Sequence, residues 1–102
     1  MAKVKKETQG LDKQHYQVLM AEHLSELRNI LGISQSVLAD YIGTTRQTIN
    51  SIENKKRPMM WDTFMSLVLL FISNEETKKQ MAQYDMNPQK ITEFLSVNKT
   101  KT

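Results

Sequence analysis

Residues 34–53 read Ser-Gln-Ser-Val-Leu-Ala-Asp-Tyr-Ile-Gly-Thr-Thr-Arg-Gln-Thr-Ile-Asn-Ser-Ile-Glu, and this stretch predicts two short helices joined by a tight turn. Ser34 can cap the free amides of the first helix. The apolar residues of that helix, which we expect to be buried to differing depths, are Val37, Leu38, Ala39 and Ile42. Gly43 can enter the left-handed region without steric cost, and Thr44 or Thr45 can cap the second helix. The stretch therefore predicts a helix-turn-helix motif.

The second helix of this motif separates apolar from polar side chains. Ile49 and Ile52 lie three residues apart and define its buried side. The residues expected to point away from that side are Arg46, Gln47, Asn50, Ser51 and Asn54. Arginine can pair with guanine in a bidentate manner, and asparagine or glutamine can do the same with adenine. Any solvated helix face can carry such residues, but their place in a helix-turn-helix favours base reading.

The charge of the chain is unevenly distributed. The chain has 14 basic and 11 acidic residues, for a net charge of +3. Between Tyr41 and Trp61 the only acid is Glu53, and the bases there are Arg46, Lys55, Lys56 and Arg57. A surface usually mixes both signs of charge, so this segment is typical of a protein that orients toward a polyanion. Chance clustering in a short chain is the alternative explanation.

These residues resemble a known family. The pattern Ser34-Gln35, Leu38-Ala39, Gly43, Thr45-Arg46-Gln47-Thr48-Ile49-Asn50 and Ile52-Glu53-Asn54 is similar to the Cro and phage-repressor (XRE-family) type of helix-turn-helix regulator. The resemblance covers roughly residues 21–72. It implies an all-α, lambda-repressor-like bundle of about five helices, to which we expect the later residues to add a C-terminal helical extension.

The resemblance also implies roles for single residues. Gln35 would contact DNA at the start of the motif's first helix, and Arg28 would pair with Glu53 as a structural ion pair. The full set of candidate DNA-binding residues is Gln35, Thr44, Thr45, Arg46, Gln47, Thr48, Asn50, Ser51, Asn54, Lys55, Lys56 and Arg57. Of these, Thr45, Arg46, Gln47 and Asn50 would face the groove.

The loop after the motif departs from the family pattern at two positions. Lys55 stands where the family often has glycine, and Pro58 comes earlier than usual. Lys55, Lys56 and Arg57 can contact DNA phosphates or form a solvated loop, and the preceding motif favours the phosphate contacts.

Length and composition narrow the class of protein. With 102 residues we expect one small domain, and with no cysteine we expect no disulfide and no thiol chemistry. His15 and His23 do not make a metal cluster, so neither a metal nor another cofactor is expected. The sequence shows neither a pair of carboxylates in an obvious pocket nor a glycine loop that could bind phosphate, so we do not expect an enzyme. The chain shows neither a secretion signal nor a membrane span, so we expect a cytoplasmic protein without a membrane partner.

The whole chain divides into three parts. We expect a flexible basic arm over residues 1–13, a DNA-binding domain over 14–72 and a helical extension over 73–102. Apolar residues from Tyr16 to Leu31 recur at helical spacing, and residues 61–72 form a helix too apolar to bury on one side only. Asn74 can cap a helix through Tyr84.

Pro88 lies near the start of a last helix, whose apolar seam consists of Ile91, Phe94, Leu95 and Val97. This seam can pack on its own chain or on a second subunit, and the resemblance does not extend to it. The arm can likewise reach DNA or serve as a solubilising tail.

Together these features predict a sequence-specific regulator that binds double-stranded DNA through the major groove, as a homodimer reading a palindromic operator. The alternative is a protein-interaction module, antitoxin-like or an adaptor, that uses the helix at 61–72 and the C-terminal seam and binds DNA weakly. Whether a small-molecule effector binds is left open, because the residues alone indicate no site for one.

Overall fold

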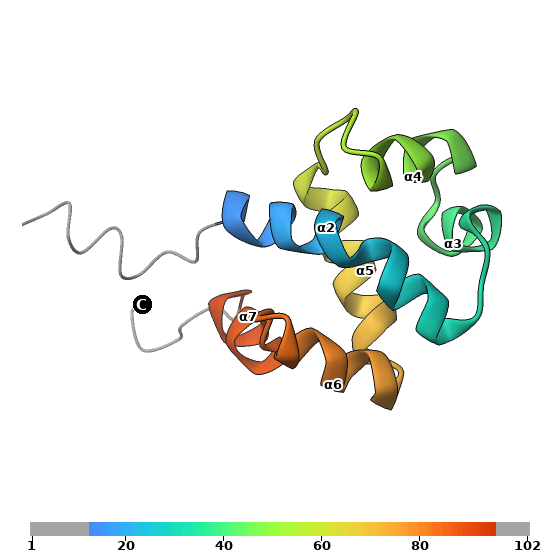
Figure 1. Ribbon diagram of the computed structural model, residues 1–102. Helices are drawn as coiled ribbons and strands as arrows, with labels where there is room; N and C mark the ends of the chain where they lie inside the picture. The colour runs from blue at the N-terminus through green and yellow to red at the C-terminus, as the bar shows by residue number, and fades with distance from the viewer. Residues whose placement is uncertain (1–12, 96–102) are drawn as a thin grey trace, which may run out of the picture.

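The computed structural model describes residues 13–95, and every regular element in that range is a helix. The all-α prediction is therefore confirmed. The six helices of the described range are α2 (Lys13–Leu31), α3 (Gln35–Ile42), α4 (Arg46–Glu53), α5 (Trp61–Ile72), α6 (Glu75–Gln83) and α7 (Pro88–Leu95) (Figure 1). Lys13 is the first residue of α2, so the described helix begins one residue inside the segment expected to be an arm.

Helices α3 and α4 form the predicted motif through local signals. The Ser34 hydroxyl accepts a hydrogen bond from the amide of Val37 at 3.1 Å, and the Thr45 hydroxyl accepts one from the amide of Thr48 at 3.1 Å. Between them Gly43 has a φ of 76°, which makes the reversal possible at no steric cost. The caps and the turn are thus confirmed, and of the two threonines considered, Thr45 is the cap.

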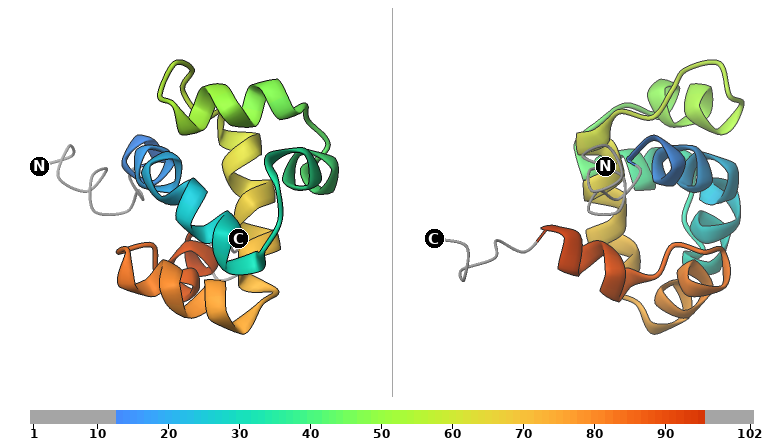
Figure 2. Two further views of the ribbon diagram at one scale, coloured as in Figure 1. Left: turned by 45° about the vertical axis from the view of Figure 1, so that its right-hand side comes forward. Right: turned by 90° about the vertical axis from the view of Figure 1, so that its left-hand side faces the viewer.

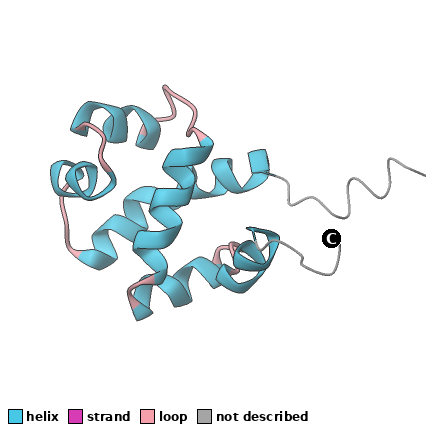
Figure 3. Cartoon of the chain, turned by 180° about the vertical axis from the view of Figure 1, so that it is seen from behind, coloured by secondary structure: helices cyan, strands magenta, loops and turns pink. Residues whose placement is uncertain are grey.

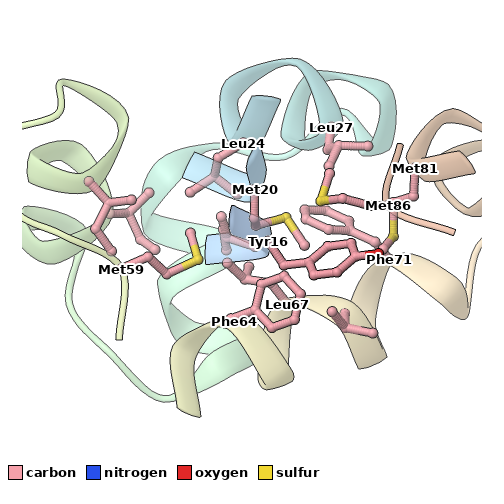
Figure 4. Close-up of a cluster of buried hydrophobic side chains, with 14 of the residues drawn as sticks. Tyr16, Met20, Leu24, Leu27, Met59, Phe64, Leu67, Phe71, Met81 and Met86 are labelled. Atoms are coloured by element: carbon pink, nitrogen blue, oxygen red, sulfur yellow. The ribbon is translucent and has the colours of Figure 1, made fainter. Parts of the chain in front are cut away.

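Helix α5 is the centre of the core. It contacts α2, α3 and α6, and it crosses α2 in Figure 1 and, seen from behind, in Figure 3. Figure 4 shows its side chains Phe64, Leu67 and Phe71 packed against Met20 and Leu24 of α2, and all five are fully buried. The multi-sided burial predicted for this helix is found, except at Leu69, which is 64% exposed.

Helices α6 and α7 lie at the end of the molecule away from α4, with α2 and α5 between (Figure 2). Asn74 caps α6 by accepting hydrogen bonds from the amides of Glu76 and Thr77, as predicted. Met81 and Ile91 are fully buried and belong to the same core cluster as α2 and α5. The C-terminal helices therefore contribute to the one core that supports the motif.

Two further apolar residues lie closer to solvent than the sequence pattern predicts. Val37, expected on the buried side of α3, is 40% exposed, and Ile30, on the apolar stripe of α2, is 41% exposed. Each lies at the margin of its helix's apolar face, where neighbouring elements no longer cover it. The side chains of Phe94 and Leu95, and Val97 as a whole, lie outside the described residues, as do residues 1–12 and 96–102. Among helices in 13–95, none combines the length and apolarity that a membrane crossing requires.

Candidate nucleic-acid interface

Helix α4 lies at one edge of the molecule with a buried and an open side (Figure 1). Ile49 and Ile52 are at most 1% exposed and fix the helix on the core. Arg46 and Gln47, at its N-terminal end, are exposed. Asn50 and Ser51 are half-buried rather than fully turned to solvent, and Asn50 lies beside Gln35 of α3. The open side of α4 is therefore widest at its first turn.

A chain of hydrogen bonds fixes the polar side chains between α3 and α4. Gln35 Nε2 donates to Glu53 Oε1 at 2.9 Å and lies 3.4 Å from Asn50 Oδ1. Arg46 Nη1 donates to Gln35 Oε1 at 3.3 Å, and Asn54 Nδ2 donates to Asn50 Oδ1 at 3.2 Å. Side chains held in this way lose little further entropy when they bind, so the face is pre-organised.

The one carboxylate of this region is neutralised inside the protein. Glu53 accepts from Arg28 Nε at 2.9 Å and from Arg28 Nη2 at 3.1 Å, and its side chain is only 8% exposed. Arg28 also donates to the carbonyl of Ile33 at 3.1 Å. Because Glu53 is buried and paired, it does not oppose the cations of the surface. The face of α4 and its following loop is positive.

The loop that follows α4 closes the helix with a backbone motif usual for glycine. The amide of Lys55 donates to the carbonyl of Ile52 at 3.0 Å, and the amide of Lys56 donates to that of Ser51 at 2.8 Å, the pattern of a Schellman cap. Lys55 itself has a φ of 58°, in the left-handed region. The lysine thus adopts the conformation that glycine has in this motif, which is why the family often has glycine there.

The twelve candidate DNA-binding residues differ in their exposure and in the contacts of their side chains. Gln47, Lys55 and Lys56 are exposed, and none makes a side-chain hydrogen bond or ion pair to another described residue. Thr48, by contrast, accepts from Arg57 Nη1 at 3.1 Å and shares a contact with the Thr45 hydroxyl at 3.0 Å. Thr44 is half-buried, and its amide closes α3 by donating to the carbonyl of Ala39.

The sequence pattern does not predict two features of this region. Gln35 was expected to contact DNA, and nothing in the sequence shows that its side chain also joins Glu53 to Asn50 and Arg46. The second feature is a groove between α2 and residues 55–60, which is described below. The only indication of this groove in the sequence is two apolar residues, Val18 and Met60, that are not part of the buried core.

Two residues with shifted pKa values, Glu26 and Tyr84, lie away from α4, where α2 contacts α6. The pKa of Glu26 is lowered by hydrogen bonds from His23 and then from Tyr84. Burial, followed by the hydrogen bond to Glu26, raises the pKa of Tyr84. The His23 and Tyr84 rings are stacked with centroids 3.7 Å apart. Within residues 13–95 no cluster of three or more potential metal ligands occurs.

Comparison with known proteins identifies the same segment. A family model described as helix-turn-helix matches residues 24–59, which include the second half of α2, all of α3 and α4, and the loop as far as Met59. No curated protein and no solved structure gives a significant match to the chain.

Proposed function

We propose that this chain, whose residues 24–59 form a DNA-binding helix-turn-helix domain of the Cro and phage-repressor (XRE-family) type, is a sequence-specific transcriptional regulator that places α4 in the major groove. The observation that carries the proposal is the composition of the open face of α4. Arg46, Gln47 and Asn50 have the donors and acceptors that suit base edges, and the only carboxylate of α4, that of Glu53, is paired with Arg28.

The candidate residues divide into three roles under this proposal. Arg46, Gln47 and Asn50 select bases, with Ser51 and Asn54 beside them on the same helix face. Gln35 and the three threonines Thr44, Thr45 and Thr48 fix the register on the DNA. Lys55, Lys56 and Arg57 bind phosphates, which gives affinity for any sequence and a strong dependence on salt.

We further propose that the regulator acts as a homodimer on a palindromic site. An apolar surface supports this: Tyr41 at the end of α3 is 67% exposed, Leu69 of α5 is 64% exposed, and both border one shallow depression together with Ile42 and Leu70. A second copy packed there would cover side chains that the monomer leaves in water. Two α4 helices would then read half-sites about 34 Å apart, one turn of DNA.

The test is selection of random double-stranded DNA by the purified full chain at about 0.15 M ionic strength, followed by sequencing of the bound pool. A palindromic motif supports both parts of the proposal, and its spacing gives the distance between the two α4 helices. A motif without symmetry supports base reading and contradicts the dimer. No enrichment contradicts sequence-specific reading.

The exposed Tyr41–Leu69 surface also favours a second candidate function, that of an interaction module for a different protein. Sedimentation of the purified chain separates the two. A concentration-dependent dimer that Leu69→Lys disrupts supports the homodimer. A strict monomer at all concentrations, together with a stable heteromeric complex from source cells that Leu69→Lys abolishes, supports the interaction module.

A further inference from the structure

An open groove of about 650 Å³ lies between the first half of α2 and the loop from Lys55 to Met60. Val18 of α2 and Met60 of the loop border it, with Ile52 and Met59 among its apolar lining. Gln17 Nε2 donates to the carbonyl of Met59 at 2.8 Å, and this bond ties the loop to α2. The groove is thus formed before anything binds, and its volume is within the usual range for small-molecule sites.

Part of the apolar lining is exposed to solvent. Val18 is 50% exposed and Met60 is 62% exposed, which makes them two of the few large apolar residues of the described range that remain in water. The side chains that line the groove include no aromatic ring, so flat ring systems find no stacking partner there. The surface suits a flexible aliphatic chain, because the thioether side chains of Met59 and Met60 can adapt to such a shape.

The charges of the groove are concentrated at the loop. Lys55, Lys56 and Arg57 all border it, against the single carboxylate of Glu22. Within residues 13–95 neither Lys55 nor Lys56 forms an ion pair, and Arg57 donates to the neutral hydroxyl of Thr48. An anion at this end would therefore meet three cations against the one carboxylate that borders the groove.

We propose that the groove binds an amphipathic monoanion, a carboxylate with an unbranched aliphatic chain. The chain would lie along Val18 and Met60, and the carboxylate would lie at Lys55 and Lys56. This inference rests in part on the proposed function, because the same lysines are the proposed phosphate contacts. Ligand and DNA then compete, and the ligand acts as an effector that releases the protein from DNA.

DNA alone does not account for the groove. Phosphates engage the lysine ammonium groups but bury no apolar surface, so Val18 and Met60 would stay exposed in a DNA complex. An aliphatic carboxylate uses both halves of the site. The apolar contact should make the affinity increase with chain length, since each added methylene removes further apolar surface from water.

The first experiment is calorimetric titration of the full chain with decanoate below its micelle concentration. Decanol tests the need for charge, and butyrate tests the need for the chain. We expect saturable binding of one decanoate per protein chain, with decanol and butyrate each weaker by about tenfold or more. Equal affinity for decanol and decanoate, or no saturable binding of decanoate, would overturn the proposal.

The matched variants are Val18→Glu, in the groove, and Ile30→Glu, on the same helix but outside it. Both positions are at least 41% exposed, so both variants should fold, as circular dichroism can verify. Val18→Glu should weaken decanoate binding about tenfold, by adding a like charge and removing an apolar contact. Ile30→Glu should leave it unchanged. Equal effects of the two variants would place the ligand elsewhere.

Binding to random-sequence duplex DNA separates this inference from the proposed function. Decanoate should weaken DNA binding of the wild-type chain and of Ile30→Glu, but not of Val18→Glu, which should still bind DNA. If the chain binds DNA and decanoate has no effect on it, the effector role is wrong and the DNA-binding function stands. If the chain binds decanoate but no DNA, the proposed function is wrong and the groove is a ligand site alone.

Discussion

Arg28 of α2 and Glu53 of α4 form a two-point ion pair, with Nε to Oε2 at 2.9 Å and Nη2 to Oε1 at 3.1 Å. The pair joins the first helix of the core to the last residue of the candidate recognition helix. Gln35 donates to the same carboxylate, so the orientation of the α3–α4 face depends on it. One structural pair therefore sets both the position of α4 and the positive sign of its surface.

Arg28→Ala should lower the free energy of unfolding by about 3–5 kcal/mol, because it leaves the mostly buried Glu53 carboxylate without its cation. Urea denaturation measures the loss. The double variant Arg28→Met with Glu53→Met should recover much of it, since it leaves no unpaired buried charge. A loss below about 1 kcal/mol in Arg28→Ala would mean that the pair behaves as a surface ion pair.

Lys55→Gly should raise the free energy of unfolding by about 1 kcal/mol, because glycine adopts a φ of 58° without the steric cost that lysine has. Thermal unfolding of the two proteins measures the difference. Lys56→Gly is the control: it removes the same charge one residue later, where φ is not positive, and should give no gain. Equal shifts in both variants would attribute the effect to charge.

Ile91→Ala should lower the free energy of unfolding by about 2–5 kcal/mol, as for other fully buried aliphatic residues. Because Ile91 of α7 belongs to the same core cluster as α2 and α5, the variant should still unfold in one transition. Ile30→Ala, at a 41% exposed position, serves as the control and should change stability little. A separate early transition in Ile91→Ala would show that residues 73–95 unfold independently of the motif.

Tyr84→Phe should raise the pKa of Glu26 toward its ordinary value, because it removes the 2.7 Å hydrogen bond from the Tyr84 hydroxyl. The pKa of Glu26 in the folded protein lies below that in the unfolded chain. Its contribution to stability is therefore present above the unfolded pKa and is lost as pH falls through the folded pKa. An NMR titration of the Glu26 carboxyl measures the change, and an unshifted titration in the variant would assign the lowering to His23 alone.

The parts of the fold that the sequence predicted depend on signals within one helical turn. Ser34, Gly43 and Asn74 each act on amides or dihedral angles a few residues away, so their effects can be read directly. Residues 61–72 are predicted as a helix from a different but equally contiguous signal, an apolar run too long for a buried strand.

The parts that the sequence did not predict depend on how distant segments pack. The hydrogen bond from Gln35 to Glu53 depends on how α3 packs against α4, which brings together two residues that are far apart in the sequence. The groove exists because Val18 faces a loop about forty residues later in the sequence. In the sequence, Lys55 stands out only because the resembling family often has glycine at that position. The sequence does not show that the lysine nevertheless adopts the left-handed backbone conformation.

The most direct test of base reading by α4 is to repeat the selection of random DNA with Arg46→Ala and Lys56→Ala. The proposed division of roles predicts that Arg46→Ala loses the preference for one base pair in each half-site, at a cost of about 1–3 kcal/mol there. Lys56→Ala should select the wild-type motif with a uniformly lower affinity and a smaller salt dependence. The same motif from wild type and Arg46→Ala, with equal losses on selected and random DNA for both variants, would contradict the account.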